Sequence, residues 1–269
     1  MLKKMLILLL TAGLLLAVPN AVMAAAFKLS ATAKTAMDKL AASDKTSGGK
    51  ITSQYNELLK VQAETSKTES AVTLLHKANS DAEALVRKQI TAINAVKRSQ
   101  LEAQVKQTRD KYEPLFTMYT ALNKQISAAR ALNSKTYSSI LRSQADIVQS
   151  AVQLARADIK IKESALKAVK DSTSQTAKKI RATLDEADPL RARISAEKSA
   201  MSTPKKLITE FGKNLNQAIK QKSASGVLAS LNSMVTTARQ LGEQNKKILD
   251  LEKKVSDVIA KAKGQIPKP

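Results

Sequence analysis

The sequence of 269 residues contains no cysteine and no tryptophan, and its only histidine is His76. The lack of cysteine excludes disulfide bonds, thiol catalysis and thiolate metal sites. His76 has no second imidazole with which to share a metal ion, so we expect an ordinary histidine at the edge of the core. The composition therefore predicts no metal centre, and packing alone must stabilise the fold.

Residues that form turns are scarce as well. The chain has seven glycines and six prolines, and aromatic residues make up 3% of it. A β protein needs more aromatic residues and many more turns. Alanine, lysine, leucine, glutamine, serine and threonine dominate instead, which predicts an all-α protein. The few breakers delimit two long helices, from Ile51 to about Tyr112 and from Leu115 to about Glu186. Pro114 either starts a new helix or kinks a continuing one, and we favour a turn because Glu113 is a weak N-cap.

Shorter helices are expected on both sides of these two. Asp188-Pro189 and Thr203-Pro204 each combine an N-cap residue with a proline at the first helical position. Ser47-Gly48-Gly49 and Ser225-Gly226 are typical of breaks between helices. The expected shorter helices cover residues 28–46, about 189–200, 204–222 and 227–262.

The first residues have the three-part pattern of a secretory signal peptide. Lys3 and Lys4 precede an apolar run from Met5 to Val18, and small residues follow it. Cleavage is expected after Ala24 or Ala26. A retained membrane anchor is the alternative, but the run is shorter than the roughly 20 residues that span a bilayer. With no cysteine near the cleavage site, a lipid anchor is excluded.

These signals divide the chain into five parts. They are a signal peptide at 1–24, a short N-terminal helix with a glycine linker at 25–49, a long helical hairpin at 50–186, basic C-terminal helices at 187–262 and an extended tail at 263–269.

The expected architecture is an elongated antiparallel helical bundle, a coiled-coil-like rod of two long helices with the shorter C-terminal helices packed back along it. A helix of about 60 residues is about 90 Å long, which rules out a compact ball. A parallel self-associating rod is the competing arrangement. The turn signals favour the intrachain bundle, because pairing within one chain has a lower entropy cost.

Apolar residues recur at every seventh position, as in helices that pack along a common seam. In the second long segment a column of large residues lies beside a column of mostly small ones, which favours close approach of a neighbouring helix. The large column is Tyr119, Ile126, Asn133, Ile140, Ile147, Leu154, Ile161 and Ala168. The companion column is Leu122, Ala129, Thr136, Ser143, Ser150, Ala157 and Ser164.

Two other segments show the same spacing. The last helix has a fully apolar column, whereas polar residues interrupt the columns of the first long helix, so the expected core is narrow. The last helix contributes Val227, Met234, Leu241, Ile248, Val255 and Ala262. The first long helix contributes Ile51, Leu58, Thr65, Val72, Asn79, Val86 and Ile93 beside Val61, Thr68, Leu75, Ala82, Gln89 and Val96.

Motifs of catalysis are missing from the sequence. It has no glycine-rich phosphate loop, no nucleophile elbow and no HExxH. Acidic pairs such as Asp81 with Glu83 and Asp185 with Glu186 are too close in sequence to share a helix face, so we interpret them as solvated charges. We expect no catalytic residue, no bound cofactor and no enzyme activity.

Positive charge is the strongest compositional signal. Basic residues exceed acidic ones by 45 to 23, and removal of Lys3 and Lys4 with the leader leaves a net charge of +20. The excess rises from +2 over residues 25–49 to +9 over residues 187–269.

Lysines spaced seven residues apart place their ammonium groups on one helix face, and such a face suits a repeating polyanion. A solvated bundle exterior is the alternative interpretation. The candidate anion-binding residues are Lys206, Lys213, Lys220, Lys246, Lys247, Lys253, Lys254 and Lys261.

These features predict an exported, non-enzymatic binding or structural protein of a bacterial cell envelope or the extracellular space, located in the cell wall or periplasm or secreted. Its expected partner is an anionic cell-wall polymer or an anionic membrane surface. Binding to nucleic acid would be nonspecific and salt-sensitive, and a protein partner or self-association is a further option. A membrane-active helical toxin component that acts on anionic membranes is the alternative function, although aromatic anchors for such a role are few.

Overall fold

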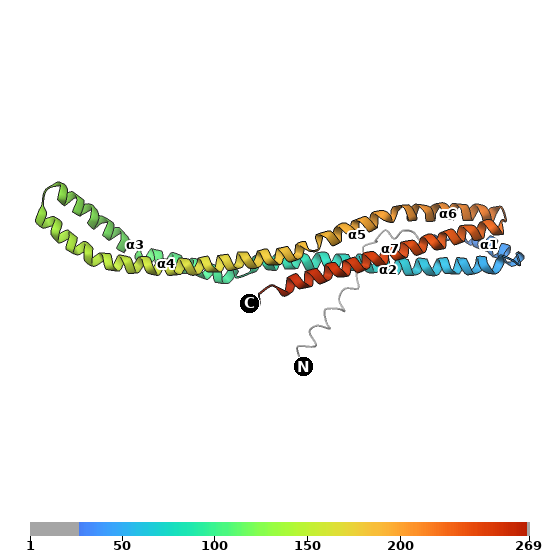
Figure 1. The fold of residues 1–269 in the computed structure, drawn as a ribbon, viewed down its shortest axis with the longest axis horizontal. Coiled ribbons are helices and arrows are strands. Elements are labelled where there is room, and N and C mark those ends of the chain that lie inside the picture. Colours follow the sequence, from blue (N-terminus) through green and yellow to red (C-terminus); the bar gives the residue numbers. More distant parts are fainter. Residues whose placement is uncertain (1–26, 268–269) are drawn as a thin grey trace, which may run out of the picture. The chain divides into compact units, whose positions relative to one another are not determined.

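The computed structural model describes residues 27–267, so the expected leader, its cleavage sites after Ala24 and Ala26, and the last two residues of the predicted tail lie outside the described residues. About 91% of the described residues are helical and none of them is in a strand, which confirms the predicted all-α bundle class (Figure 1). The helices are α1 (Ala31–Ser43), α2 (Gly48–Ala92), α3 (Ala95–Ala131), α4 (Lys135–Asp185), α5 (Asp188–Ala200), α6 (Ser202–Lys220) and α7 (Ala224–Gly264).

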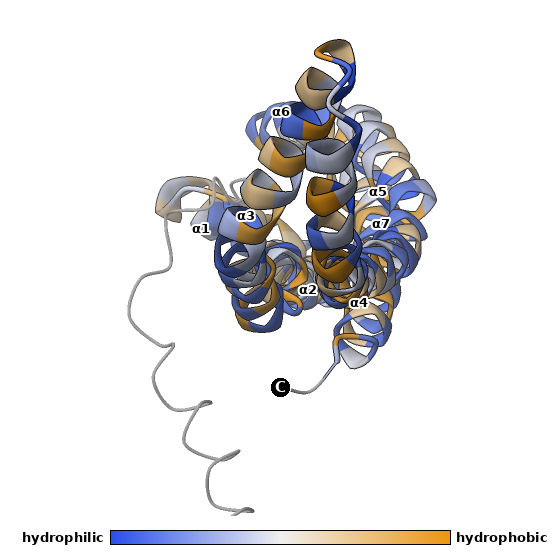
Figure 2. Ribbon diagram, turned by 90° about the vertical axis from the view of Figure 1, so that its left-hand side faces the viewer, coloured by the Kyte–Doolittle hydropathy of each residue, from blue (hydrophilic) through white to orange (hydrophobic). Residues whose placement is uncertain are grey.

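The described residues form two compact units, one of residues 27–84 and 183–261 and the other of residues 85–182 and 262–267. In the first unit, α1, α6 and the N-terminal parts of α2 and α7 share one apolar core. Figure 2 shows that hydrophobic and hydrophilic residues are mixed on every helix, so a helix buries only part of its surface. The largest fully buried side chains of this core are Met37, Ile51, Leu58, Leu215, Leu231 and Met234.

Two of the predicted seven-residue columns are confirmed as buried faces. Every member of the column from Val227 to Ala262 is at most 9% exposed. On α2, the column from Ile51 to Ile93 is buried throughout except at Thr65, which is half-buried. The companion column of α2 is fully buried only at Val61. Of these two columns, α2 therefore buries only one over much of its length.

Phe27 closes the first unit against α6. Its ring packs on Gly212, where an added Cβ would lie 2.6 Å from the ring carbon Cε2. A glycine is needed at this position because any larger residue would displace the aromatic ring. The contact joins the segment that precedes α1 to the middle of α6.

The second unit contains an antiparallel pair, α3 and α4. Contacts between the two helices move to lower residue numbers on α4 as they move to higher numbers on α3. Near the turn, Ile126 and Ala129 of α3 pack with Leu141 and Ala145 of α4. The polar contacts are Asn94 with Thr173 at 2.9 Å, Glu102 with Lys170 at 2.9 Å, Arg109 with Glu163, and Tyr112 with Asp158 at 3.2 Å.

The turn predicted at Pro114 is wrong. Pro114 lies inside α3, and the chain reverses at Asn133, which has a left-handed φ of 55°. The amide of Ser134 donates to the carbonyl of Ala129 at 3.0 Å, as in a Schellman helix end. Proline removes one amide donor from the helix, but α3 is held on α4 on both sides of Pro114, and such packing outweighs local preference.

Two further breaks also differ from the prediction. Asn94 separates α2 from α3 and Lys222 separates α6 from α7, both with positive φ, whereas no glycine of the described residues has one. Gly48 and Gly226, which we expected to break the chain, lie in the first turns of α2 and α7. Asparagine adopts the left-handed conformation more readily than most residues, so asparagines rather than glycines end two of the long helices.

The predicted column from Tyr119 to Ala168 is correct before the chain reversal and wrong after it. Tyr119 and Ile126 contribute to the core of the second unit, but Ile140, Ile147, Leu154 and Ile161 are exposed. Because α3 ends just before Asn133, its seven-residue pattern does not continue into α4. Different positions of α4 therefore face α3. In the first 21 residues of α4 the buried residues are Ser138, Leu141, Ala145, Val152 and Ala155, and Leu141 and Ala155 directly follow Ile140 and Leu154 of the predicted column.

The left-handed conformation of Asn133 can be tested by substitution. Asn133→Val should lower the free energy of unfolding by about 1–2 kcal/mol, because a β-branched residue is strained in this conformation. Asn133→Gly should leave it unchanged or raise it slightly. Unfolding followed by far-UV circular dichroism measures both. Asn123→Val in the interior of α3 is the control, and an equal loss in the control would contradict the assignment of the turn.

Candidate anion-binding surface

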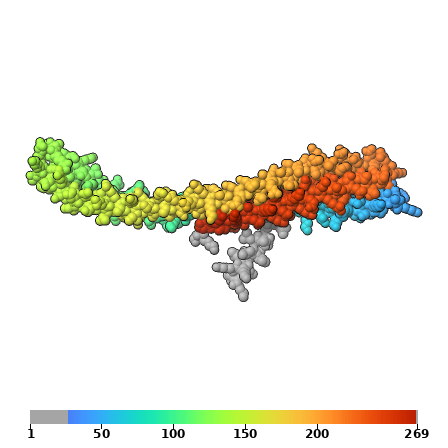
Figure 3. Space-filling view, viewed as in Figure 1, coloured from blue at the N-terminus to red at the C-terminus, as the bar shows by residue number. Residues whose placement is uncertain are grey.

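The eight candidate lysines lie on two helices of the first unit, and every one of them is exposed. The two helices share a core, and Figure 3 shows the surfaces of α6 (orange) and α7 (red) adjoining on one face. The α6 row is Lys206, Lys213 and Lys220. The α7 row is Lys246, Lys247, Lys253, Lys254 and Lys261.

Carboxylates already pair with three lysines of the α7 row. Lys246 lies 2.8 Å from Glu243, Lys253 lies 2.9 Å from Asp250, and Lys261 lies 2.9 Å from Glu186. The hydrogen bond from Lys246 to Glu243 raises the pKa of this lysine. Exposed pairs of this kind contribute about 1 kcal/mol or less, so a polyanion could displace them, but they reduce the net field of α7.

The α6 row has no such partners. Within residues 27–267, no ion pair involves Lys206, Lys213 or Lys220, and the same holds for Lys247 and Lys254 of α7. Helix α6 carries four lysines and a single glutamate in 19 residues, whereas α7 carries seven basic and four acidic residues in 41. Net positive charge per residue is therefore higher on α6 than on α7.

A groove between α1 and α6 adds two cations, Lys39 and Lys222, that do not belong to the predicted lysine rows. It has a volume of about 800 Å³, and its lining includes Lys39, Lys220 and Lys222 but no carboxylate. Ala36 and Leu40 supply part of its apolar wall. No sequence pattern identifies Lys39 as a member of this surface, because only the packing of α1 on α6 brings it close to Lys220.

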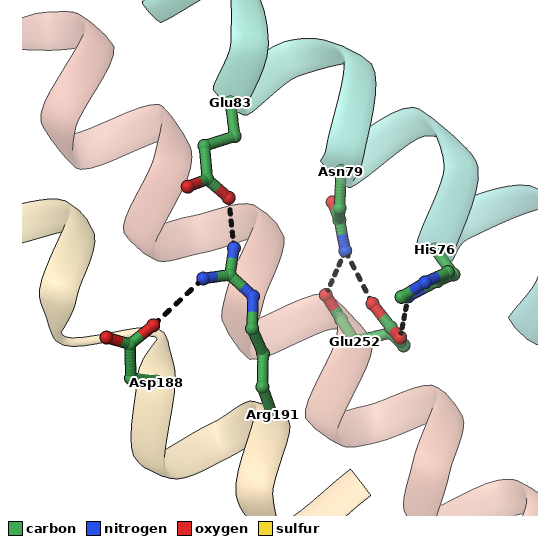
Figure 4. A network of polar contacts seen from close by, with 6 residues as sticks. All are labelled: His76, Asn79, Glu83, Asp188, Arg191 and Glu252. Atoms are coloured by element: carbon green, nitrogen blue, oxygen red, sulfur yellow. Dashed lines mark hydrogen bonds and ion pairs between the residues drawn. The ribbon is translucent and has the colours of Figure 1, made fainter. Parts of the chain in front are cut away.

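A second polar feature of the first unit is a cluster centred on Glu252 of α7, drawn in Figure 4. Glu252 is only 1% exposed. Its Oε1 lies 2.7 Å from Nδ1 of His76, and Asn79 donates through Nδ2 to Oε2 at 2.9 Å and to the carbonyl of Glu252 at 2.8 Å. The buried carboxylate thus has partners on both of its oxygens.

Arg191 of α5 forms the other half of this cluster (Figure 4). It pairs with Glu83 of α2 and, at 3.0 Å, with Asp188. The interpretation of Glu83 as a solvated charge is therefore wrong: its side chain is only 14% exposed and is held by the guanidinium. Only the packing of α5 on α2 brings these two charges together.

The arrangement of the cluster is that of a structural polar network. A depression of about 360 Å³ borders it, with Ser80, Ser195 and Lys198 also in the lining. The carboxylates that a general acid or base would use are engaged by His76, Asn79 and Arg191. In the part of the chain that the structure describes, no three His, Cys, Asp or Glu side chains are grouped so that they could hold a metal ion.

None of the helices within residues 27–267 combines the length and the hydropathy of a membrane span. No protein family, no curated protein sequence and no solved structure matches the chain.

The structural role of Glu252 leads to a stability prediction. Glu252→Ala should lower the free energy of unfolding by about 3 kcal/mol, because it removes the side-chain acceptor of the buried Asn79 and the partner of His76 and leaves a cavity in their place. Asp250→Ala, on the exposed face of the same helix, should change it by less than about 0.5 kcal/mol. Denaturant titration of both variants measures the difference, and equal effects would show that the cluster contributes nothing particular to stability.

Proposed function

We propose that this chain is an exported, non-enzymatic helical protein of the cell envelope or the extracellular space, and that it binds anionic polymers through the α6 row and the α7 row. The observation that carries the proposal is the exposure of all eight lysines on two helices that pack together. Five of the eight have no ion-pair partner among the described residues.

The physical basis of the binding is the release of counterions from a polyanion. Each lysine that neutralises an anionic group frees small cations, so affinity falls steeply as salt is added. Lysine is suited to this role because its ammonium group is a compact point charge without the directional fork of arginine. We therefore expect the protein to prefer polyanions of high charge density, whatever their sequence or detailed shape. Cell-wall polymers are the proposed partner, and nucleic acid would bind in the same nonspecific way.

Carboxylates pair with three lysines of the α7 row and with none of the α6 row, so we expect the α6 row to contribute more to polymer binding. Replacing Lys206, Lys213 and Lys220 by Gln should weaken retention on purified cell wall more than replacing Lys247, Lys254 and Lys261. Each triple variant should reduce the slope of log affinity against log salt, by roughly two to three if all three lysines contact the polymer. Retention measured across a salt series gives both quantities.

A third variant with the same net charge serves as the control. Lys97, Lys124 and Lys135 are exposed lysines of α3 and α4, outside both rows. Their replacement by Gln changes the total charge equally but should leave the salt slope nearly unchanged. If all three triple variants lose the same affinity, net charge alone would explain retention and the proposed surface would be rejected.

The alternative function is a membrane-active toxin component, and the same proteins test it. Release of dye from anionic vesicles, without retention on cell wall, would favour that alternative. Export itself is part of the proposal, since the leader is inferred from sequence. The secreted protein should begin at Ala25 or Phe27 when its N-terminus is sequenced.

The elongated rod of two long helices also belongs to the proposal. A compact protein of about 245 residues has a radius of gyration of about 18 Å. A rod at least as long as α4, whose 51 residues span about 76 Å, should exceed this value by about a fifth or more. Small-angle scattering of the mature protein measures it, and a value near that of a compact protein would contradict the rod.

A further inference from the structure

Helix α4 has two apolar rows, and only one of them is covered. The inner row, Leu141, Ala145, Val152 and Ala155, is at most 6% exposed and faces the core of the second unit. The outer row consists of Ile140, Ile147, Leu154 and Ile161. These four side chains are 53%, 76%, 74% and 64% exposed.

The outer row is a regular apolar stripe, whereas the exposed apolar residues of an ordinary protein surface are scattered singly. Its members recur every seven residues over 21 residues, a distance of about 32 Å along the helix. Three positions after each of them stands a small residue, and all four small residues are exposed. The small residues are Ser143, Ser150, Ala157 and Ser164. None of these eight positions is charged, so the face has the composition of a helix-packing seam.

We propose that a second copy of this chain docks on the outer row with its own α4 in antiparallel orientation. In an antiparallel helix pair, each layer joins one position of the large column with one of the small column. Ile147 then faces Ala157 of the second copy, and Leu154 faces Ser150. Every layer contains one large and one small side chain, which lets the helices approach closely and evenly. A parallel pair would stack isoleucine on isoleucine and serine on serine.

The charges beside the row favour the same arrangement. Asp146 and Lys160 each precede a member of the outer row by one residue, both are exposed, and no ion pair involves either of them within the described residues. In the antiparallel pair, Asp146 lies opposite Lys160 of the second copy, and the two-fold axis repeats the contact. In a parallel pair they would lie opposite Ala151 and Ala165. Like the rest of the contact, these pairs are self-complementary.

The proposed interface is small, since one helix pair forms it. Such an interface is typical of weak, reversible association, so we expect a dimer that forms in the micromolar range. Salt should preserve or strengthen it, because salt screens the repulsion between two cationic chains. The outer row lies on α4 and the proposed polymer-binding rows lie on α6 and α7, so a failure of one proposal leaves the other unaffected.

Sedimentation velocity of the mature protein over a range of concentrations tests the association. Ile147→Asn with Leu154→Asn should raise the dissociation constant at least about tenfold, since both residues are central to the interface. The melting temperature should stay the same because both side chains are exposed. Leu74→Asn with Leu85→Asn, which replaces two exposed leucines of α2, is the control and should leave the dissociation constant unchanged.

Charge reversal tests the orientation. Asp146→Lys and Lys160→Asp should each weaken the dimer, and the variant with both changes should recover most of the affinity. The absence of cysteine permits a second test with single cysteines. Ala151→Cys should form a disulfide across the two-fold axis, whereas Ser143→Cys should not, since its two copies would lie about 27 Å apart.

The outcomes separate the possibilities. A disulfide at Ala151→Cys together with recovery in the doubly reversed variant supports the antiparallel dimer. A disulfide at Ser143→Cys alone would show a parallel dimer and overturn the proposal. A chain that remains monomeric at all concentrations, or a dimer that is insensitive to the asparagine substitutions, would overturn it as well.

Discussion

The burial of narrow apolar rows is the interaction on which the helical fold of this protein depends most. There is no disulfide and no metal site among the described residues to assist, so the helices are held by residues such as Leu58, Leu231 and Met234 that recur once or twice per heptad. Each turn of helix can bury only one or two side chains in such a seam. The remaining positions must face solvent, and in this chain many of them are lysines. The large polar exterior is thus a consequence of the way the core is built, and the excess of basic over acidic residues makes it cationic.

Polar residues within the seam make the packing specific. Most apolar side chains could shift by a heptad along a partner helix at modest cost, because the pattern repeats. The buried carboxylate of Glu252 cannot, since a shift would separate it from Asn79 and His76 and leave it without partners. Arg191 adds a comparable constraint between α5 and α2. The polar cluster therefore selects one register among several that the apolar rows alone would permit.

The two proposed interactions have different physical origins and complement each other. Attraction between lysine rows and a polyanion weakens with salt, whereas contact between two outer rows does not depend on unlike net charges. A dimer through α4 would carry two copies of the α6 and α7 rows. Two linked surfaces bind a long polymer with an avidity that exceeds the affinity of either one, provided that both reach it. Even weak self-association would then strengthen the binding of the protein to a repeating anionic surface.

Sequence alone determined the helical class, the buried columns of α2 and α7, and the outward position of the eight lysines, because each of these follows from periodicity within one helix. Tertiary structure decided the rest. The chain reverses at Asn133 and not at Pro114, since packing of α3 on α4 overrides a local breaker, and this reversal leaves the row from Ile140 to Ile161 exposed. Likewise, the burial of Glu83 and Glu252 and the place of Lys39 beside Lys220 depend on contacts between residues far apart in the chain, and no local pattern encodes those contacts.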